Sequence, residues 1–430
     1  MHRIPAKAYL SGADYFNLLV ERNLGRLGYY GNIIHVALDL DGNMSLKELS
    51  QLCQSKEMLP WLNAYELKTP YPMAVPYWKR GRKGIPIPMC EVSETDSVIP
   101  EALLKLDLKP EAGKLFHLAL VQRSNAFTRV VLSAHHSIID NRGMQMLVDF
   151  IGSPENTTDL DIFPERQEKA SVVQRMKQFN EARHFLMDAD QNVAGLPNGQ
   201  AQPNLKSQYT MINFSEAETQ RIDENGVKVG ARFGNGPFFL ASAARAVNGI
   251  MTQRETAGKI IWIPVPQNQR MRGGKGALLS NQISFMFYRI PHKKLNSIHD
   301  AVREFSEQMV QQVRTKMPQS YATMMNIFRR LPLAAYNFFM KLPTKGVVTT
   351  FSFSDLGDSL PDTDVFLRRR ILDVHHYPPN PVPPGFTVVF MRFQNRLRVV
   401  VGSTEQSMSP AELVNFEKLL RSDLLQESAS

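Results

Sequence analysis

The sequence predicts an α/β (α+β) fold built from two layered subdomains. Helix-like and strand-like segments alternate in both halves of the 430-residue chain, an order typical of sheets covered by helices. The length allows a large core and suggests two domains or one large one. Hydrophobic residues make up 43% of the chain and charged residues 21%, as in an ordinary globular protein.

The N-terminal half is predicted to deliver a β-hairpin into a short polar loop. Two β-rich runs within residues 115–134 flank a polar turn at Ser124 and Asn125. Ser45 is a candidate helix cap, with Glu48 three residues later as in a capping box. The other elements expected in this half are helices at 12–23 and 142–150 and a strand at 32–42.

The C-terminal half repeats the alternation. Residues 210–228 are predicted to form a strand and then a helix capped by Ser215, and one apolar helical face runs through residues 301–317. The remaining predicted elements are helices at 238–251 and 409–424, strands at 260–266 and 282–291, and a hairpin at 386–402.

A change of composition marks the boundary between the halves. Turn-forming residues dominate two stretches between residues 153 and 208, on either side of a helix-like piece at 172–187. We therefore predict an N-terminal subdomain over 1–187, a linker over 188–208 and a C-terminal subdomain over 209–430.

Charge and cysteine content narrow the function classes. The net charge of +9 calls for an anionic partner, and coenzyme A phosphates or an anionic membrane surface fit at least as well as nucleic acid, whose motifs are missing. Cys53 and Cys90 are expected to be free thiols. The first residues lack a secretory pattern, so we expect a cytoplasmic protein.

The most informative motif is SAHHSIIDNRG, residues 133–143. It sets His135 and His136 at the end of the hairpin, with Asp140 four residues beyond the second histidine. A histidine held at a strand end can act as a general base near neutral pH. A metal site is the alternative, but it needs further ligands at suitable spacing. The only cysteines, Cys53 and Cys90, lie far apart and in no CxxC motif, so no metal is expected. A second pair, His375 and His376, is predicted to lie in a loop and has no aspartate after it.

The order His-His-x-x-x-Asp after a strand resembles the HHxxxDG signature of the chloramphenicol acetyltransferase-like superfamily, which includes peptide-synthetase condensation domains. The resemblance implies two subdomains with a tunnel and the active site at their interface. It also implies that His136 is the base and that Asp140 organises the loop. Asn141 stands at the signature's glycine position, and a glycine follows only at Gly143.

Further motifs are similar to those of bacterial wax ester synthase/diacylglycerol acyltransferases, in the same order. They are LSGADYF (10–16), NGPFFLASAARAV (235–247), IPVPQNQR (263–270), LSNQISFMFYRIP (279–291) and FSFSDLGD (351–358). Gly236, Ser280 and Asp355 replace the family's aspartate, glycine and asparagine. We therefore expect the chain to be a divergent acyltransferase of this superfamily, closest in appearance to that branch.

The resemblance implies transfer of an acyl group from a thioester to an alcohol. Coenzyme A or phosphopantetheine would carry the acyl group as co-substrate, with no bound cofactor. The candidates for contacting the substrate or the oxyanion are Ser354, Asp355, Gly357 and Asn281. Arg270 is the candidate cationic partner of Asp140, because Asn63 stands where relatives carry an arginine.

Two rival functions stay open. One is a condensation-type enzyme that makes an amide from substrates bound to a carrier protein. The other is a catalytically reduced module that binds acyl thioesters or a carrier protein. A last expectation concerns residues 324–341, which mix aromatic and basic residues around Pro332. They are expected to pack as helices split at the proline, with peripheral membrane contact as the alternative.

Overall fold

The computed structural model describes residues 4–29, 31–70, 73–92, 99–122, 127–152, 161–164, 170–188, 192–196, 202–203, 206–270, 276–360 and 363–426. The fold is mixed α/β, as predicted. The predicted turn at Ser124 and Asn125 and about half of the predicted linker lie outside the described residues.

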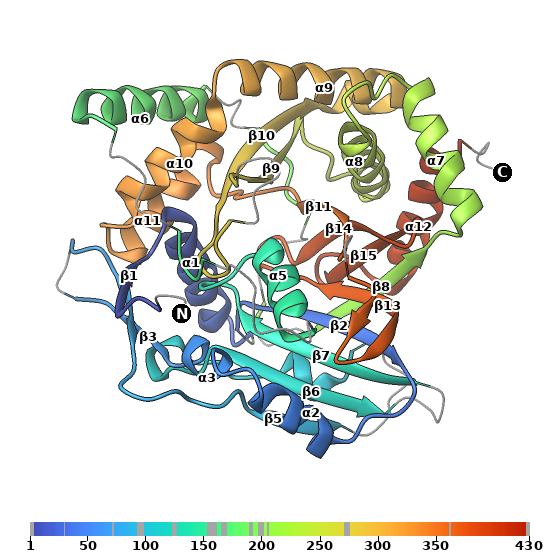
Figure 1. Ribbon diagram of the computed structural model, residues 1–430. Helices are drawn as coiled ribbons and strands as arrows, with labels where there is room; N and C mark the ends of the chain where they lie inside the picture. Colours follow the sequence, from blue (N-terminus) through green and yellow to red (C-terminus); the bar gives the residue numbers. More distant parts are fainter. Residues whose placement is uncertain are drawn as a thin grey trace.

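A six-stranded sheet forms the lower layer in Figure 1. Its order is β12 (Val365–Phe366), β13 (Arg369–Tyr377), β2 (Ile33–Asp41), β7 (Phe127–His135), β6 (Phe116–Gln122) and β5 (Met89–Val92). Strand β2 is buried along nearly its whole length, which matches its run of apolar residues. The predicted hairpin of β6 and β7 is confirmed, since the two strands pair antiparallel.

Strand β13 joins this sheet from the far end of the sequence. Val374 pairs with Leu38 and His376 with Val36 on β2, and Figure 1 shows the orange β13 beside the blue β2. The prediction that His375 and His376 lie in a loop was wrong, because both belong to β13. The prolines from Pro378 onward follow the strand and end it.

Three smaller sheets complete the β structure. A four-stranded sheet has the order β11 (Ser352–Asp358), β14 (Phe386–Phe393), β15 (Arg396–Thr404) and β8 (Ser207–Asn213). A two-stranded sheet pairs β10 (Ile283–Pro291) with β9 (Ile260–Asn268), and a three-stranded sheet has the order β1 (Lys7–Tyr9), β4 (Tyr77–Arg80) and β3 (Tyr65–Lys68).

Helices cover the sheets. They are α1 (Gly12–Arg26), α2 (Leu46–Gln54), α3 (Leu59–Leu62), α4 (Glu101–Leu104), α5 (Asn141–Gly152), α6 (Val172–Met187), α7 (Glu216–Lys228), α8 (Gly236–Gln253), α9 (Ile298–Arg314), α10 (Met317–Phe328), α11 (Leu333–Lys341) and α12 (Pro410–Leu425). Short 3₁₀ turns are η1 (Pro110–Ala112), η2 (His292–Asn296) and η3 (Leu342–Thr344). In Figure 1, α5 lies above the six-stranded sheet and α2 below it.

The helix ends follow local signals in the sequence. Ser215 caps α7, and with Glu218 it forms a complete capping box. Ser45 accepts a hydrogen bond from the backbone of Glu48, which is one half of the predicted box. The helix predicted over 301–317 ends at Arg314, and Met317 opens α10. Pro332 separates α10 from α11, as predicted.

Two large apolar clusters form the core. One packs around the six-stranded sheet and α5, and the other packs around α8, α12 and the four-stranded sheet. A small third cluster joins α1, α6, α10 and the β9–β10 pair. Within the described residues, no helix is long and apolar enough to cross a membrane.

Candidate active site

The HHSIID loop begins where β7 leaves the six-stranded sheet. The N–H of His135 donates to the carbonyl of Leu115 (2.9 Å), and the N–H of His136 donates to the carbonyl of Asn32 (2.8 Å). The sheet therefore holds the backbone of both histidines up to the point where the chain turns. A side chain placed this way has a defined direction, which a general base requires.

His136 presents one ring nitrogen for chemistry. Its Nδ1 lies 2.9 Å from the carbonyl oxygen of Ile139. A carbonyl only accepts, so Nδ1 carries the proton and Nε2 is the basic nitrogen. Burial lowers the pKa of His136 below its ordinary value, although the Ile139 carbonyl and Asp140 act in the opposite direction. The imidazole is therefore neutral at pH 7 and able to accept a proton.

His135 points away from the reaction space. Its Nδ1 lies 2.8 Å from the Ser137 hydroxyl and accepts from the Ser137 N–H (3.2 Å), and its Nε2 lies 3.6 Å from Glu21 Oε2. The side chain is fully buried and does not line the cavity that His136 faces. These contacts support a positioning role for His135, and a direct role in the chemistry stays a prediction.

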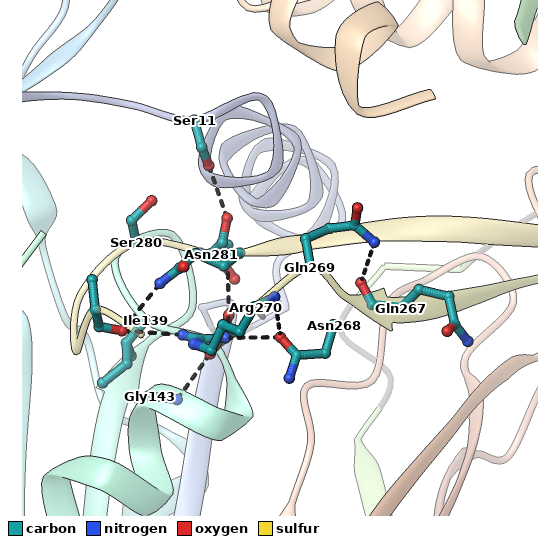
Figure 2. A network of polar contacts seen from close by, with 12 residues as sticks. Ser11, Ile139, Gly143, Gln267, Asn268, Gln269, Arg270, Ser280 and Asn281 are labelled. Atoms are coloured by element: carbon teal, nitrogen blue, oxygen red, sulfur yellow. Dashed lines mark hydrogen bonds and ion pairs between the residues drawn. The ribbon is translucent and has the colours of Figure 1, made fainter. Parts of the chain in front are cut away.

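Asp140 ties the loop to a distant part of the chain. Arg270 donates from Nη1 to Oδ2 (2.8 Å) and from Nη2 to Oδ1 (2.9 Å). The backbone N–H of Gly143 and that of Gln282 also donate to this carboxylate (both 2.8 Å). Asp140 therefore begins α5 as its cap and holds the strand pair β9–β10 against the loop. Figure 2 shows Arg270, Gly143 and Asn281 in the same network.

A second buried carboxylate, Asp14, lies beneath the same loop. It accepts from the backbone N–H (2.6 Å) and the side-chain amide (2.9 Å) of Asn281, and from the hydroxyl of Ser280 (2.9 Å). The amide of Asn281 also donates to the carbonyl of His136 (2.7 Å). Burial raises the pKa of Asp14, against the effect of these hydrogen bonds. Asp14 thus supports the backbone of the candidate base through Asn281.

These contacts correct the expectation for Asn281. Both N–H bonds of its side chain are used, one by Asp14 and one by the His136 carbonyl, and its Oδ1 accepts from Asn17 (3.1 Å). No donor is left for an oxyanion. Asn281 is therefore a positioning residue that links α1 to the loop.

Several residues at the motif positions discussed above have local structural roles. Ser280, at a glycine position, has a φ of 80°, a backbone conformation that favours glycine. Its hydroxyl bond to Asp14 offsets part of that cost. A Cβ at Gly143 would lie 2.5 Å from the Leu278 carbonyl oxygen, so glycine is required there. Asn63 accepts from the backbone N–H groups of Leu115 and Phe116 (both 3.2 Å) and so supports the sheet.

His136 opens onto a large cavity of about 1310 Å³. Its wall is largely apolar and includes Phe16, Trp262, Phe285, Tyr321, Phe328 and Met340. Cationic side chains also line it, namely Arg26, Arg142, Arg183 and Lys341. Mostly apolar walls with a few fixed polar groups are typical of small-molecule sites, and the volume suits a bulky substrate.

Solved structures share this architecture. No protein-family model matches the chain, and no curated protein matches it. The first condensation domain of the CDA synthetase superposes with a TM-score of 0.71 at 13% identity, over 99% of this chain and 97% of its own. The chain has the condensation-domain fold. This confirms the predicted two-subdomain, chloramphenicol acetyltransferase-like architecture.

Two further structures with the condensation-domain fold bear on the chemistry. The TRI3 trichothecene 15-O-acetyltransferase from Fusarium sporotrichioides matches with a TM-score of 0.69 at 10% identity, over 97% of this chain and 95% of its own. The starter condensation domain of rhizomide synthetase RzmA, as a variant in complex with C8-CoA and Leu-SNAC, matches at 0.65 and 13% identity, over 98% and 94%. At such identities the likeness shows the fold, so activity has to be argued from the site.

The FSFSDLGD motif, whose residues are predicted to contact the substrate, forms strand β11. Ser354 and Asp355 line the same cavity as His136, and no described residue hydrogen-bonds the Ser354 hydroxyl. Asp355 is accessible from the cavity, yet the surrounding walls raise the pKa of its carboxyl by burial. Gly357 does not line the cavity, and its N–H donates to Asp355 (3.1 Å). Its φ of 63° favours glycine at the irregularity of β11 between Asp355 and Asp358.

Neither thiol forms part of the site. Cys53 is buried, and burial raises its pKa to about 12, while Cys90 is partly buried with a raised pKa for the same reason. Both are free and neither lines the cavity. Among the described residues, no group of three or more His, Cys, Asp or Glu side chains could hold a metal ion.

Three contributors to the site were missed in the sequence. Asp14 lies in the LSGADYF motif. The sequence signal there is the similarity of the motif to a family motif, and it does not point to the carboxylate. Gln282 acts through its backbone N–H, which no residue pattern reveals. His376 lines the cavity from β13, whereas the sequence predicts a loop with no following aspartate for its pair.

Proposed function

We propose that this protein transfers an acyl group from a thioester to a hydroxyl acceptor, with His136 as general base. The single observation that carries the proposal is the placement of His136. Its Nδ1 is fixed by the Ile139 carbonyl, and the side chain faces a large apolar cavity. A neutral imidazole with one nitrogen held and the other presented to substrate is the arrangement that proton transfer needs.

The reaction can be written as one exchange. The acceptor hydroxyl gives its proton to Nε2 of His136 while its oxygen bonds to the acyl carbon. The C–S bond then breaks, and the leaving thiolate takes the proton back from His136. No covalent enzyme intermediate is required, because binding both substrates beside one base supplies the geometric advantage.

The developing oxyanion needs a donor. Asn281 is excluded because its hydrogens are occupied. We propose the Ser354 hydroxyl, which lines the cavity without a partner among the described residues. Burial raises the pKa of Asp355, but an ionised carboxylate next to Ser354 would oppose the developing negative charge.

The cavity wall suits a bulky apolar acyl group or acceptor, and a thioester carrier that bears phosphates. Its aromatic residues suit an acyl or acceptor chain, and Arg26, Arg183 and Lys341 on the wall suit the phosphates of coenzyme A or phosphopantetheine. The motif likeness to wax ester synthase/diacylglycerol acyltransferases points to the same substrate class.

An acyl-CoA panel tests the proposal. Free thiol release is measured with saturated acyl-CoAs of increasing length and pooled alcohols, and the product is identified by mass spectrometry. We expect acceptor-dependent release with wild type and its loss in His136→Ala. Release that does not depend on any acceptor, or that survives His136→Ala, contradicts the proposal.

Amide formation is the second candidate, favoured by the likeness to peptide-synthetase condensation domains. The same panel with pooled amines, and with an acyl carrier protein in place of coenzyme A, separates the two. Amide products that require the carrier protein would select this alternative. Thioester binding without turnover in every arm would select a catalytically reduced binding module.

We further propose peripheral membrane contact through α11. Tyr336 is buried, whereas Phe338 and Phe339 are 62% and 43% exposed beside the basic Lys341. Aromatic rings next to cations suit the headgroup region of an anionic bilayer.

Wild type should co-sediment with phosphatidylglycerol vesicles at low salt and less at high salt. Phe338→Ser/Phe339→Ser should lose binding, whereas Val414→Ser, a change at an exposed residue of α12, should keep it. Failure of wild type to sediment contradicts the proposal.

A further inference from the structure

A second histidine, His376, faces the cavity and has no hydrogen-bond partner among the described residues. Its side chain is 2% exposed and lines the cavity wall. Neither Nδ1 nor Nε2 is hydrogen-bonded by any described residue. A buried imidazole of this kind leaves one donor and one acceptor unmatched, which is costly to the folded state.

The neighbouring residue shows that the lack of partners is specific to His376. His375, on the opposite side of β13, lies 3.1 Å from Asp39 through Nε2, and its Nδ1 lies 2.7 Å from Arg398. Arg129 completes this buried ion network through Asp39. Successive residues of a strand point to opposite faces. Both ring nitrogens of His375 therefore contact polar side chains, whereas His376 faces the cavity.

Strand register relates His376 to the candidate base. His376 pairs with Val36 on β2. Asn32, which immediately precedes β2 and lies four residues before Val36, accepts from the N–H of His136 through its carbonyl. Residues four apart on a strand share a face. His376 and His136 therefore face the same side of the sheet, two strands and four residues apart, with Cα atoms separated by roughly 16 Å for ideal strands. A substrate reacting at His136 would reach His376 only with a remote part of its chain.

The chemistry of the ring restricts what it can take. Burial lowers the pKa of His376 to about 3, and the neighbouring His375 acts in the same direction, so the ring is neutral at pH 7. A neutral imidazole offers one N–H and one lone pair, which matches a hydroxyl. Among the described residues that line this mostly apolar cavity, His376 is a ring with both nitrogens unmatched, and an alkyl chain would leave it so.

We propose that His376 forms a polar subsite that recognises a hydroxyl group on the substrate chain, remote from the reacting atoms. The inference rests on the proposed acyl transfer for the identity of the chain, which is either the acyl group or the acceptor. His376 is a specificity residue and takes no part in bond making.

Binding to His136→Ala, which holds substrates without turnover, tests the subsite apart from activity. Isothermal titration compares α,ω-diols from octyl to tetradecyl length with the matching monoalcohols, and ω-hydroxyacyl-CoAs with the matching acyl-CoAs. A preference for the diols places the recognised hydroxyl on the acceptor, and a preference for the ω-hydroxyacyl-CoAs places it on the acyl group. For at least one length we expect the hydroxylated ligand to bind roughly threefold to tenfold more tightly.

Two substitutions of His376, made in the same background, separate recognition from folding. His376→Leu should bring the ratio of affinities close to one and raise the melting temperature, because an unmatched buried polar group is replaced by a well-packed apolar one. His376→Gln, which keeps a donor and an acceptor, should retain part of the preference. No preference at any length, or a preference that survives His376→Leu, overturns the subsite. A preference without thiol release from wild type would refute the proposed function and leave the subsite standing.

Discussion

The chain has two pairs of neighbouring histidines, His135–His136 and His375–His376. The pairs lie near the ends of two strands of the same sheet, β7 and β13. In each pair one ring is buried among polar partners and the other faces the cavity. His136 has one nitrogen held by the Ile139 carbonyl and lies next to a carboxylate that is paired with Arg270. Neither ring nitrogen of His376 has a hydrogen-bond partner in the part of the chain that the structure describes. The comparison teaches that a strand-end histidine becomes a candidate base through the groups that hold it.

The loop after the first pair provides this support. Asp140 receives four hydrogen bonds from Arg270, Gly143 and Gln282, and Asn281 fixes the carbonyl of His136. The second pair is followed by prolines, which lack an N–H to donate and offer no such cap. Its ion network engages His375 alone.

The sharpest test of the comparison removes each cavity-facing ring. His136→Ala should lower thiol release by about 100- to 10,000-fold, the usual contribution of a general base, with an unchanged circular dichroism spectrum. His376→Gln should lower it by no more than about tenfold with substrates that lack a remote hydroxyl. Equal losses from the two variants would assign chemistry to both rings and break the comparison.

The support of the first pair can be removed directly. Asp140→Ala should destabilise the protein by about 3–5 kcal/mol, because it leaves Arg270 buried without its partner, and activity should fall with it. The double variant Asp140→Ala/Arg270→Met should lose less stability than the two single variants combined. Denaturant unfolding measures this cycle. If Asp140→Ala keeps wild-type stability but is inactive, Asp140 acts in the chemistry itself.

Within the first pair, His135 should matter less for activity than His136, which faces the cavity. His135→Ala should cost about 1–3 kcal/mol of stability, because the Ser137 N–H loses its acceptor inside the core. Thiol release at a temperature where the variant is folded should fall by less than about tenfold. A loss as large as that of His136→Ala would show that the assignment of base and positioning residue is wrong.

Acid pH should affect the two cavity-facing rings differently. The lowered pKa of His136 keeps its neutral form abundant below pH 6.5, so kcat/KM should hold through pH 6.5 and decline only at lower pH. The pKa of His376 falls from 6.5 unfolded to about 3 folded. Its contribution to stability is therefore complete above pH 6.5 and is lost as the pH falls toward 3, by about 1.4 kcal/mol per pH unit.

Wild type and His376→Gln, unfolded by denaturant at pH 7 and pH 5, provide the measurement. The variant should lose about 2 kcal/mol less than wild type over this interval. Equal losses would show that His376 is not held neutral in the folded protein.

Local patterns predicted much of the secondary structure. The hairpin over 386–402 appears as β14 and β15, and Ser215 caps α7, because pleat alternation and cap hydrogen bonds act between near neighbours. Local reasoning failed where a distant strand decided the outcome. Residues 373–377 look like the start of a proline-rich loop, but pairing with β2 extends them into a strand.

The sequence by itself determined the mixed α/β class, the strand that delivers His136, and the need for a cation beside Asp140. Those features depend on periodicity, residue chemistry and one short motif. The tertiary structure decided that Arg270 meets Asp140 across 130 positions, that Asp14 reaches the same loop through Asn281, and that His376 enters the cavity. Each of these depends on where separate strands and helices pack in space, and long-range packing leaves no periodic signal in the residues it brings together.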